Sequence, residues 1–357
     1  MFDIKNDISK LDRNFAVKPS IEKCGMSFFS IDEEPFSVYG VFKENDCYRR
    51  IPEKTAKLIS DGVLSLSTNS AGGRVRFKTD SEHISVTVKM GAVGKMPHFA
   101  LTGSVGLDAY VEHEGEERYI GTFIPPFDIA DGFEGTVGFS GKEMRKITIF
   151  LPTYSTVSEL YIGVDSDSRL EKSDDYSISK PVVYYGSSIT QGGCSSRPGN
   201  AYQSIISRRI CCDFINLGFS GNAKGEPQMA EYIAGLNMSA FIYDYDHNAP
   251  TAEHLQKTHE AMFTTIRNAH PQIPIVILSR PKYYLTDDEK QRFRIIKATY
   301  DNAVAAGDRN VYLIDGKTLM ADARDNGTVD GCHPNDWGFA CMAKAVGDVL
   351  EKVLKDC

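Results

Sequence analysis

The chain has 357 residues, of which 41% are hydrophobic and 25% are charged, and its formal net charge is −8. This composition is typical of a soluble globular protein, and the length favours two domains. No basic arm or stripe offsets the acidic balance, so no nucleic-acid partner is expected. The charged start MFDIKNDISK lacks the apolar stretch of a secretory signal, and no segment reaches the ~18 apolar residues of a membrane span. We therefore expect no membrane partner and a cytoplasmic location, although an exported protein whose signal had been removed would look the same.

The first half of the chain has the texture of an all-β domain. From about 35 to 165, short runs rich in Val, Ile, Phe, Tyr and Thr, such as RVRFKT and KITIFLP, alternate with turn clusters such as SAGG and DGFEG. No long helical stretch is expected among them. The pattern predicts an antiparallel, jelly-roll-like β-sandwich over residues 1–170, and the polar segment 165–180 is the expected domain joint.

From residue 181 onward, apolar strands alternate with amphipathic segments of helical length. Five strand-then-helix units in a row predict a five-stranded parallel sheet with helices on both faces, which is a three-layer α/β/α, flavodoxin-like domain over residues 178–357. The expected strands are PVVYYG, FINLG, AFIYDYD, PIVILS and VYLID, and the expected helices span about 201–212, 226–235, 251–269, 287–305 and 336–355.

Polar residues follow several of these strands, at the sheet edge where open α/β folds bind ligands. Ser187 and Ser188 follow the first strand, Gly221 lies in the loop after the second, and Asn248 follows the third. Asp330 and His333 stand just ahead of the last helix. A serine hydroxyl needs a base to become nucleophilic, and the base needs an orienting acid, so these residue types suit nucleophilic catalysis. Backbone N–H groups and an amide can supply donors for an oxyanion.

These loops resemble the four sequence blocks of the SGNH/GDSL hydrolases, in the same chain order. GSSIT (186–190) resembles the first block, with Ser187 in place of its aspartate, and NLGFSGN (216–222) resembles the second. DYDHN (244–248) resembles the third block but departs from its usual pattern, and DGCHP (330–334) resembles the last. The resemblance implies Ser188 as nucleophile, His333 as base and Asp330 as its orienting acid. It also implies Ser188, Gly221 and Asn248 as oxyanion donors.

The first half of the chain carries a further resemblance. GLDAY (106–110), with Ala109 in place of leucine, is similar to the GxDLY-type domain that precedes some SGNH domains. Members of this group are generally acylhydrolases or acetylhydrolases, many of them acting on carbohydrate esters. The resemblance therefore implies a small-molecule ester substrate, with an acetylated carbohydrate as the first candidate.

Each motif taken alone has an ordinary structural explanation. A Gly-Ser-Ser after a strand is usually a turn, and a polar loop before a helix often supplies its cap. The conjunction of the blocks on one sheet edge is what favours a catalytic site. Near the first block, Gln191, Arg197 and Asn200 are candidate hydrogen-bonding residues for a hydroxylated substrate, and the loop-like stretch MPHF (96–99) is expected to border the same cleft.

Competing chemistries have weaker support. The histidines at 247, 254, 259 and 270 lack metal-ligand spacing, so no metal and no other cofactor are expected. Cys194 and Cys332 lie near the predicted site, where lining a pocket is the favoured role because neither has a separate histidine and orienting acid. The eight cysteines form no disulfide framework and are expected to be reduced.

The sequence thus predicts a serine esterase that removes a short acyl group, with acetyl favoured, from a carbohydrate or similar small hydroxylated compound. Two alternatives stay open. One is an acyltransferase that uses the same acyl-enzyme, and the other is a catalytically inactive carbohydrate-binding protein. The natural substrate and the oligomeric state are left open by the sequence.

Overall fold

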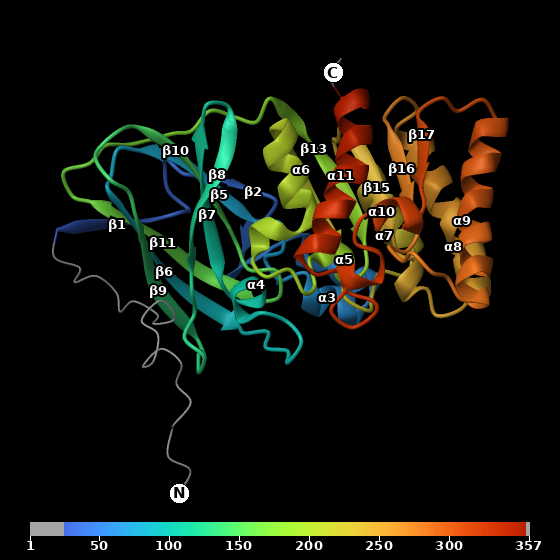
Figure 1. Cartoon of the computed structure of the whole chain (residues 1–357), viewed down its shortest axis with the longest axis horizontal. Helices are drawn as coiled ribbons and strands as arrows, with labels where there is room; N and C mark the ends of the chain where they lie inside the picture. The colour runs from blue at the N-terminus through green and yellow to red at the C-terminus, as the bar shows by residue number, and fades with distance from the viewer. Residues whose placement is uncertain (1–24, 355–357) are drawn as a thin grey trace, which may run out of the picture.

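A computed structural model describes residues 25–354, and the parts of both predicted domains at 1–24 and 355–357 lie outside the described residues. Two units lie side by side (Figure 1), a β-rich unit on the left and an α/β unit on the right. The chain passes from the last strand of the first unit, which ends at Glu171, to the first strand of the second, which begins at Ile178. This crossing falls within the segment expected to join the domains.

The β-rich unit is built from two antiparallel sheets, as predicted. Apolar side chains alternate along its strands, for example Val86 and Val88 or Ile147 and Ile149, and fill the space between the sheets. One sheet has the order β1 (Met26–Ser30), β11 (Thr156–Asp165), β6 (His83–Ala92) and β9 (Gly132–Gly138). The other has the order β12 (Leu170–Glu171), β5 (Arg74–Thr79), β10 (Arg145–Phe150), β7 (Leu107–His113) and β8 (Glu116–Phe123), with β2 (Ser37–Tyr39) beside β5. The segment DGFEG, expected as a turn, is therefore largely strand β9.

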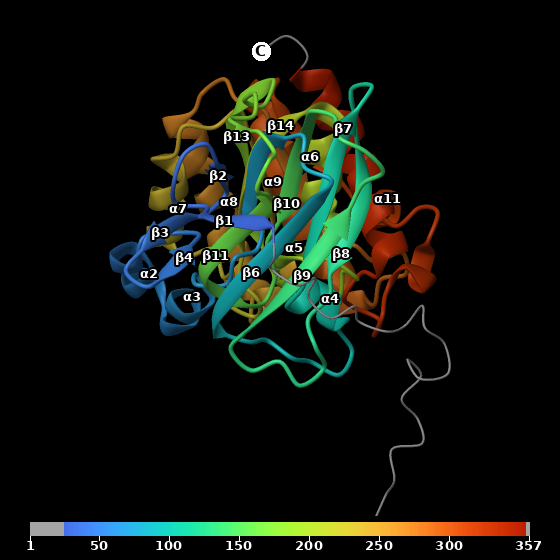
Figure 2. The same ribbon diagram turned by 90° about the vertical axis from the view of Figure 1, so that its left-hand side faces the viewer.

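The first half also contains short helices that the sequence did not predict. After the hairpin of β3 (Phe42–Glu44) and β4 (Cys47–Arg49) come α2 (Glu53–Ile59) and α3 (Asp61–Leu66), and α4 (Leu101–Ser104) follows β6. Ser60 caps α3 by accepting a hydrogen bond from the Val63 N–H. Figure 2 shows α2 and α3 below β3 and β4, at the edge of the sandwich. Ala56 and Val63 are fully buried in the hydrophobic core of the α/β unit, so this part of the first half completes the second unit.

The α/β unit has the predicted three layers. Its five parallel strands have the order β14 (Cys212–Gly218), β13 (Ile178–Gly186), β15 (Ala240–Asp244), β16 (Ile275–Leu278) and β17 (Val311–Ile314). Helices α6 (Tyr202–Ile210) and α11 (Asp336–Val353) cover one face, and α7 (Pro227–Ala234), α8 (Ala252–Ala269) and α9 (Asp287–Ala305) cover the other. The expected helix 201–212 ends at Ile210, because Cys211 adopts a left-handed conformation that stops it.

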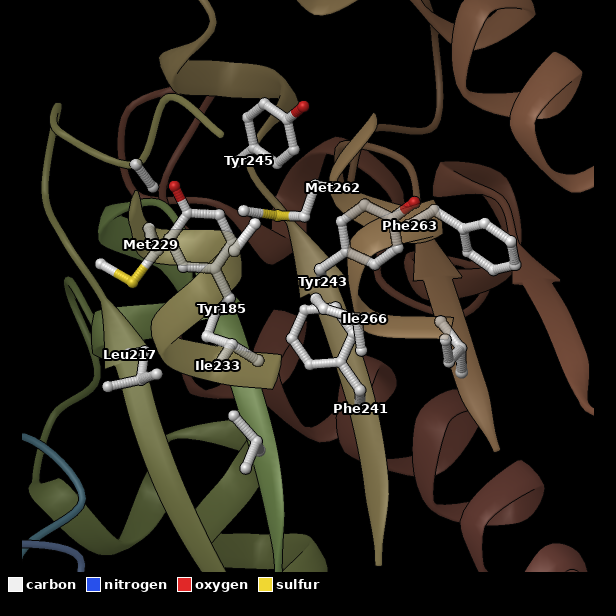
Figure 3. Packing of buried hydrophobic residues seen from close by; sticks show 14 of the residues in the cluster. Tyr185, Leu217, Met229, Ile233, Phe241, Tyr243, Tyr245, Met262, Phe263 and Ile266 are labelled. Carbon is white, nitrogen blue, oxygen red and sulfur yellow. The ribbon is translucent and has the colours of Figure 1, made fainter. Parts of the chain in front are cut away.

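Both faces of this sheet are buried, which explains why its strands read as continuous apolar runs. Along β13, Val183 and Tyr185 enter one core, whereas Val182 and Tyr184 enter the other. Figure 3 shows the first of these cores, where side chains of β13 to β15 face α7 and α8. The residues labelled there are Tyr185, Leu217, Met229, Ile233, Phe241, Tyr243, Tyr245, Met262, Phe263 and Ile266.

Two properties of the chain bear on its partners. Across residues 25–354, no helix is long and apolar enough to cross a membrane. The cysteines in that range, at 47, 194, 211, 212, 332 and 341, are all free thiols.

Candidate active site

The turn after β13 separates the roles of the two adjacent serines. Gly186 is required there, because a side chain at this position would meet the Asp244 carbonyl oxygen and the Thr190 hydroxyl at 2.2 Å. Ser187 is fully buried and caps the short helix α5 (Ser188–Gln191), its Oγ accepting a hydrogen bond of 3.2 Å from the Ile189 N–H. Ser188 is the first residue of α5, and its hydroxyl is left free to face the site.

Ser188, His333 and Asp330 form a continuous hydrogen-bonded chain. Ser188 Oγ lies 2.9 Å from His333 Nε2, and His333 Nδ1 lies 2.8 Å from Asp330 Oδ2. A ring protonated at Nδ1 satisfies both contacts, since it donates to the carboxylate and offers Nε2 to the serine hydroxyl. Asp330 Oδ1 also accepts hydrogen bonds from the backbone N–H groups of Cys332 and His333. The structure thus brings together all three residues predicted as a triad, in an arrangement that can activate a serine hydroxyl.

The charge states near the serine suit this chemistry. Partial burial would raise the pKa of Asp330, but hydrogen bonds from the backbone and ring of His333 outweigh it and lower the pKa to about 2, so the carboxylate is ionised at neutral pH. Burial raises the pKa of the Cys194 thiol to about 12 and that of Cys332 to about 11. Neither cysteine is a thiolate at neutral pH, which leaves Ser188 as the nucleophile with a positioned base.

The three groups predicted as oxyanion donors are free to donate hydrogen bonds. The Ser188 N–H is at the first position of α5, where helix geometry provides no acceptor. Gly221 adopts φ 69°, a left-handed conformation that glycine tolerates, and its N–H has no protein acceptor within residues 25–354. Asn248 Oδ1 accepts a hydrogen bond of 3.3 Å from the Ala223 N–H, which fixes the amide and leaves its NH2 group free to donate. These are the predicted donors, and they lie on neighbouring loops of the sheet edge.

A buried arginine from the first half supports the loop that carries Gly221. Arg50 is 2% exposed, and its guanidinium donates to the backbone carbonyls of Asn216 and Gly218 at the end of β14. The same side chain donates to the carbonyls of Leu66, the last residue of α3, and of Asn69 in the segment that follows. Nothing in the sequence pointed to this role, because an arginine between a strand and a helix is usually exposed.

The sandwich also contributes side chains directly beside the catalytic residues. His98, in the loop between β6 and α4, has its ring centroid 5.9 Å from that of His333, and its Nε2 lies 3.9 Å from Asp330 Oδ2. Tyr154, which follows β10, donates a hydrogen bond of 3.3 Å from its hydroxyl to the Ser188 carbonyl. The stretch MPHF was expected to border the cleft, whereas nothing in the sequence pointed to Tyr154. The site therefore lies where the two units meet.

The three candidate substrate-binding residues occupy different positions. Gln191 is fully buried, and its amide donates to Asn69 and Thr153 and accepts from the Ser220 N–H. The expectation that Gln191 contacts a substrate is wrong, because its side chain is fully buried and both of its polar atoms are engaged, Nε2 with the first unit and Oε1 with Ser220 of its own unit. Arg197 is partly exposed, with 27% of its side chain accessible. Asn200 donates to Asp336 Oδ2 at 2.9 Å and so ties its loop to the start of α11.

The GLDAY motif anchors this same loop. Asp108 is fully buried, accepts hydrogen bonds from the Gly199 N–H and lies 3.2 Å from Arg197 Nε. Tyr110 donates to Asp108, and Arg208 lies over the Tyr110 ring. Burial raises the pKa of Asp108 to about 6, and the contacts of its carboxyl with Arg197 and the Gly199 N–H join the two units.

One group of side chains in the described part of the chain has the spacing of metal ligands. Donor atoms of His98, Cys194 and His333 all lie within 4.8 Å of one another. The histidines considered from the sequence have other contacts: His254 Nε2 lies 2.7 Å from the Lys224 carbonyl oxygen, and His259 Nδ1 lies 2.8 Å from Thr299 Oγ1.

Comparison with known proteins identifies related families for both halves of the chain. The model of the GDSL-like lipase/acylhydrolase family matches residues 179–354, and the GxDLY model, which describes the N-terminus of SGNH-hydrolase-type esterases, matches residues 5–170. A protein of known structure from Bacteroides ovatus, described as a GDSL-like lipase, is 30% identical with a TM-score of 0.83. That match covers 92% of this chain and 98% of the other.

Two more distant structures share the fold. The salicylyl-acyltransferase SsfX3 of a tetracycline biosynthetic pathway is 20% identical with a TM-score of 0.74, covering 93% of this chain and 98% of its own. The acetyl xylan esterase Est2A of the rumen bacterium Butyrivibrio proteoclasticus is 11% identical with a TM-score of 0.60, covering 92% and 98%. No curated protein matches the chain.

Proposed function

Because the chain belongs to the GDSL-like lipase/acylhydrolase family, we propose that it is a serine esterase that removes a short acyl group, acetyl in the first instance, from a carbohydrate or similar small hydroxylated substrate. The observation that carries the proposal is the hydrogen-bonded chain from Ser188 Oγ through His333 to Asp330, beside donors with no protein acceptor. An inactive binding protein has no physical reason to keep all of these groups aligned.

In the first half of the reaction, Ser188 Oγ attacks the ester carbonyl carbon while its proton passes to His333 Nε2. The carbonyl oxygen becomes an oxyanion that accepts hydrogen bonds from the Ser188 and Gly221 N–H groups and the Asn248 amide. The ionised Asp330 stabilises the imidazolium that forms. Collapse of the tetrahedral intermediate breaks the bond to the alcohol oxygen, which takes the proton from Nε2 and leaves as a free hydroxyl. An acyl-Ser188 ester remains.

In the second half, water attacks the acyl-enzyme and gives a proton to His333 Nε2. The second tetrahedral intermediate is held by the same donors and collapses by breaking the bond to Ser188 Oγ, which recovers the proton. The products are a carboxylic acid and the free enzyme. Replacing water with an alcohol in this step gives acyl transfer, so the ratio of the two products is a property to be measured.

The surroundings of Ser188 favour a small acyl group. Ser188 is only 7% exposed, the Tyr154 hydroxyl donates to its backbone carbonyl, and the buried Cys194 lies beside His333. The neighbouring connections are short, since β14 ends at Gly218 and α7 begins at Pro227, with no inserted lid in that loop. Arg197 and its partly exposed guanidinium can hydrogen-bond sugar hydroxyls from the side of the sandwich. Est2A shares the two-part fold, so acetylated xylan fragments are a reasonable first class to test.

The test is a series of aryl esters from acetyl to octanoyl. We expect kcat/KM to be highest for acetyl or propionyl and to fall at least about tenfold by octanoyl, because a long chain finds no matching pocket. Acetylated mono- and oligosaccharides then follow, with and without an added alcohol to separate hydrolysis from transfer. If kcat/KM rose steadily toward long acyl chains, a lipase or thioesterase would be indicated instead. If no ester were turned over, the remaining alternative would be an inactive carbohydrate-binding protein.

A further inference from the structure

We propose that a thiophilic divalent cation such as Zn²⁺ binds between His98, Cys194 and His333 and reversibly inhibits the enzyme. Binding is inferred from the ligand geometry alone, whereas the inhibition rests on the proposed serine mechanism. The cation in this proposal is an inhibitor and plays no part in turnover.

The three side chains form a suitable donor set. Two imidazoles and a thiol are the ligand types that Zn²⁺ prefers, and three protein ligands leave a fourth position for water. Their donor atoms already lie within 4.8 Å of one another. With Zn–N and Zn–S bonds of normal length, tetrahedral ligand atoms lie about 3.3–3.6 Å apart, so small side-chain movements are enough to close the site. His98 is exposed and comes from a loop, which gives it the freedom to make this adjustment.

The residues around the donors suit a bound cation. Asp330 Oδ2 accepts from His333 Nδ1 at 2.8 Å, which is the carboxylate–histidine arrangement that orients histidine ligands in metal sites. His98 Nε2 lies 3.9 Å from the same carboxylate oxygen. The thiolate of Cys194 and the carboxylate of Asp330 together balance the two charges of the cation. The groups that serve catalysis therefore also prepare His333 as a ligand.

The position of Cys194 is unusual for a residue that the reaction does not use. Its φ of 72° is left-handed, a conformation that a residue with a side chain seldom adopts. Hydrogen bonds from the Gly193 N–H to the Ser188 carbonyl, and from the Ser195 N–H to the Gly192 carbonyl, hold the turn on both sides of it. The side chain is 7% exposed and lies beside His333. The backbone thus fixes a thiol next to the catalytic base.

A cation at this site would inhibit the reaction because it would bind the ring nitrogen of His333 that acts as the base. Nδ1 of His333 is engaged by Asp330, so Nε2 is the atom available to the cation. Nε2 must also accept the proton of Ser188 Oγ, which lies 2.9 Å away. A lone pair committed to a metal cannot accept that proton. The Cys194 thiol releases its proton to solvent when the cation binds.

Binding is tested with Co²⁺, whose thiolate complexes absorb in the near ultraviolet, on the whole protein and on Ser188→Ala. Both should show a thiolate-to-cobalt band that Zn²⁺ displaces. Cys194→Ser and Cys194→Ala should lose the band, and His98→Ala should weaken Co²⁺ binding at least about tenfold. Cys332→Ser is the matched control, because its thiol lies near the site but outside the cluster, and it should keep the band. If the unaltered protein showed no thiolate-to-cobalt band, or if only Cys332→Ser lost the band, the proposed site would be overturned.

Inhibition is tested by titrating Zn²⁺ during aryl acetate hydrolysis, with each variant compared with its own metal-free rate. The unaltered protein and Cys332→Ser should lose at least about tenfold in rate and recover on chelation, whereas His98→Ala and both Cys194 variants should resist. Equal inhibition in all variants would contradict the site. Undiminished turnover by Ser188→Ala would refute the proposed serine mechanism instead, and the Co²⁺ spectra would still decide whether the site exists.

Discussion

The two adjacent serines provide the sharpest test of the mechanism, because the structure gives them opposite roles. Ser188 places its hydroxyl 2.9 Å from His333 Nε2, whereas Ser187 is fully buried and caps α5 with its hydroxyl. Replacing either with alanine removes a single oxygen atom from neighbouring positions of the same turn. A difference between the two variants therefore reports on the function of each hydroxyl and not on the presence of a serine in this turn.

The expected magnitudes differ by several orders. Ser188→Ala removes the nucleophile, which in serine hydrolases costs about 10⁴–10⁶-fold in turnover. Ser187→Ala removes one cap hydrogen bond of 3.2 Å, which costs about 1 kcal/mol of stability. For a unit of this size, that is a fall in Tm of about 2–4 °C. Because Ser188 stays at the first position of α5, Ser187→Ala should keep activity within about tenfold of the unaltered protein.

Three measurements check this pair. Hydrolysis of aryl acetate gives kcat/KM, thermal unfolding gives the loss of stability, and a fluorophosphonate probe followed by peptide mapping identifies the labelled serine. We expect the probe on Ser188 in the unaltered protein and in Ser187→Ala, and no labelling of Ser188→Ala. An inactive but folded Ser187→Ala together with an active Ser188→Ala would refute the assignment of the nucleophile.

Four further outcomes are expected. The imidazole of His333 must be unprotonated to act as a base, so kcat/KM should fall when the pH is lowered far enough to protonate a catalytic histidine. The pKa of Asp330 is lowered to about 2, so its contribution to the free energy of unfolding is present above the ordinary carboxylate pKa and is lost as the pH falls toward 2. A pH profile of kcat/KM that showed a separate loss of activity near pH 4 would count against the triad. Chelators should leave activity unchanged, and activity lost on chelation and restored by zinc or manganese would exclude the mechanism. Arg50→Met leaves buried carbonyls of Asn216 and Gly218 without their donor, so urea unfolding should show a loss of about 2–5 kcal/mol with lower kcat, and an unaffected variant would show that Arg50 does not support the oxyanion loop.

The fold of the second unit could be predicted almost completely, because its local and long-range signals agree. Strands buried on both faces read as apolar runs, and each amphipathic segment follows one of them, so the order of elements alone implies a parallel sheet. The first unit was harder. Helices α2 and α3 are too short for a clear helical period, and the residues they bury, such as Ala56 and Val63, contact a core formed by residues far away in the chain.

The site also combines residues that local sequence patterns predict with residues that only long-range contacts bring to it. Ser188, Asp330 and His333 are each marked by a turn or loop at a strand end, and the structure places them in one hydrogen-bonded chain. Gln191 was misplaced because proximity in sequence to a nucleophile says nothing about direction: it lies on the side of α5 that faces the sandwich. Tyr154 approaches the nucleophile from another domain, a contact that no local pattern encodes.

The contacts between the units explain why a sandwich accompanies this hydrolase domain. Arg50 holds the end of β14, Asp108 holds the loop before α6, and Gln191 joins α5 to Thr153 of the first unit. The contacts of Arg50 and Gln191 end on segments that carry or adjoin a predicted catalytic group, and the contact of Asp108 ends on the loop that Asn200 ties to the start of α11. Catalysis by preorganised donors requires positions fixed to within about 0.5 Å, and short loops at a sheet edge do not reach that precision unaided. The sandwich therefore acts as the outer support of the oxyanion loop and nucleophile turn, and the GLDAY motif is one of its points of attachment.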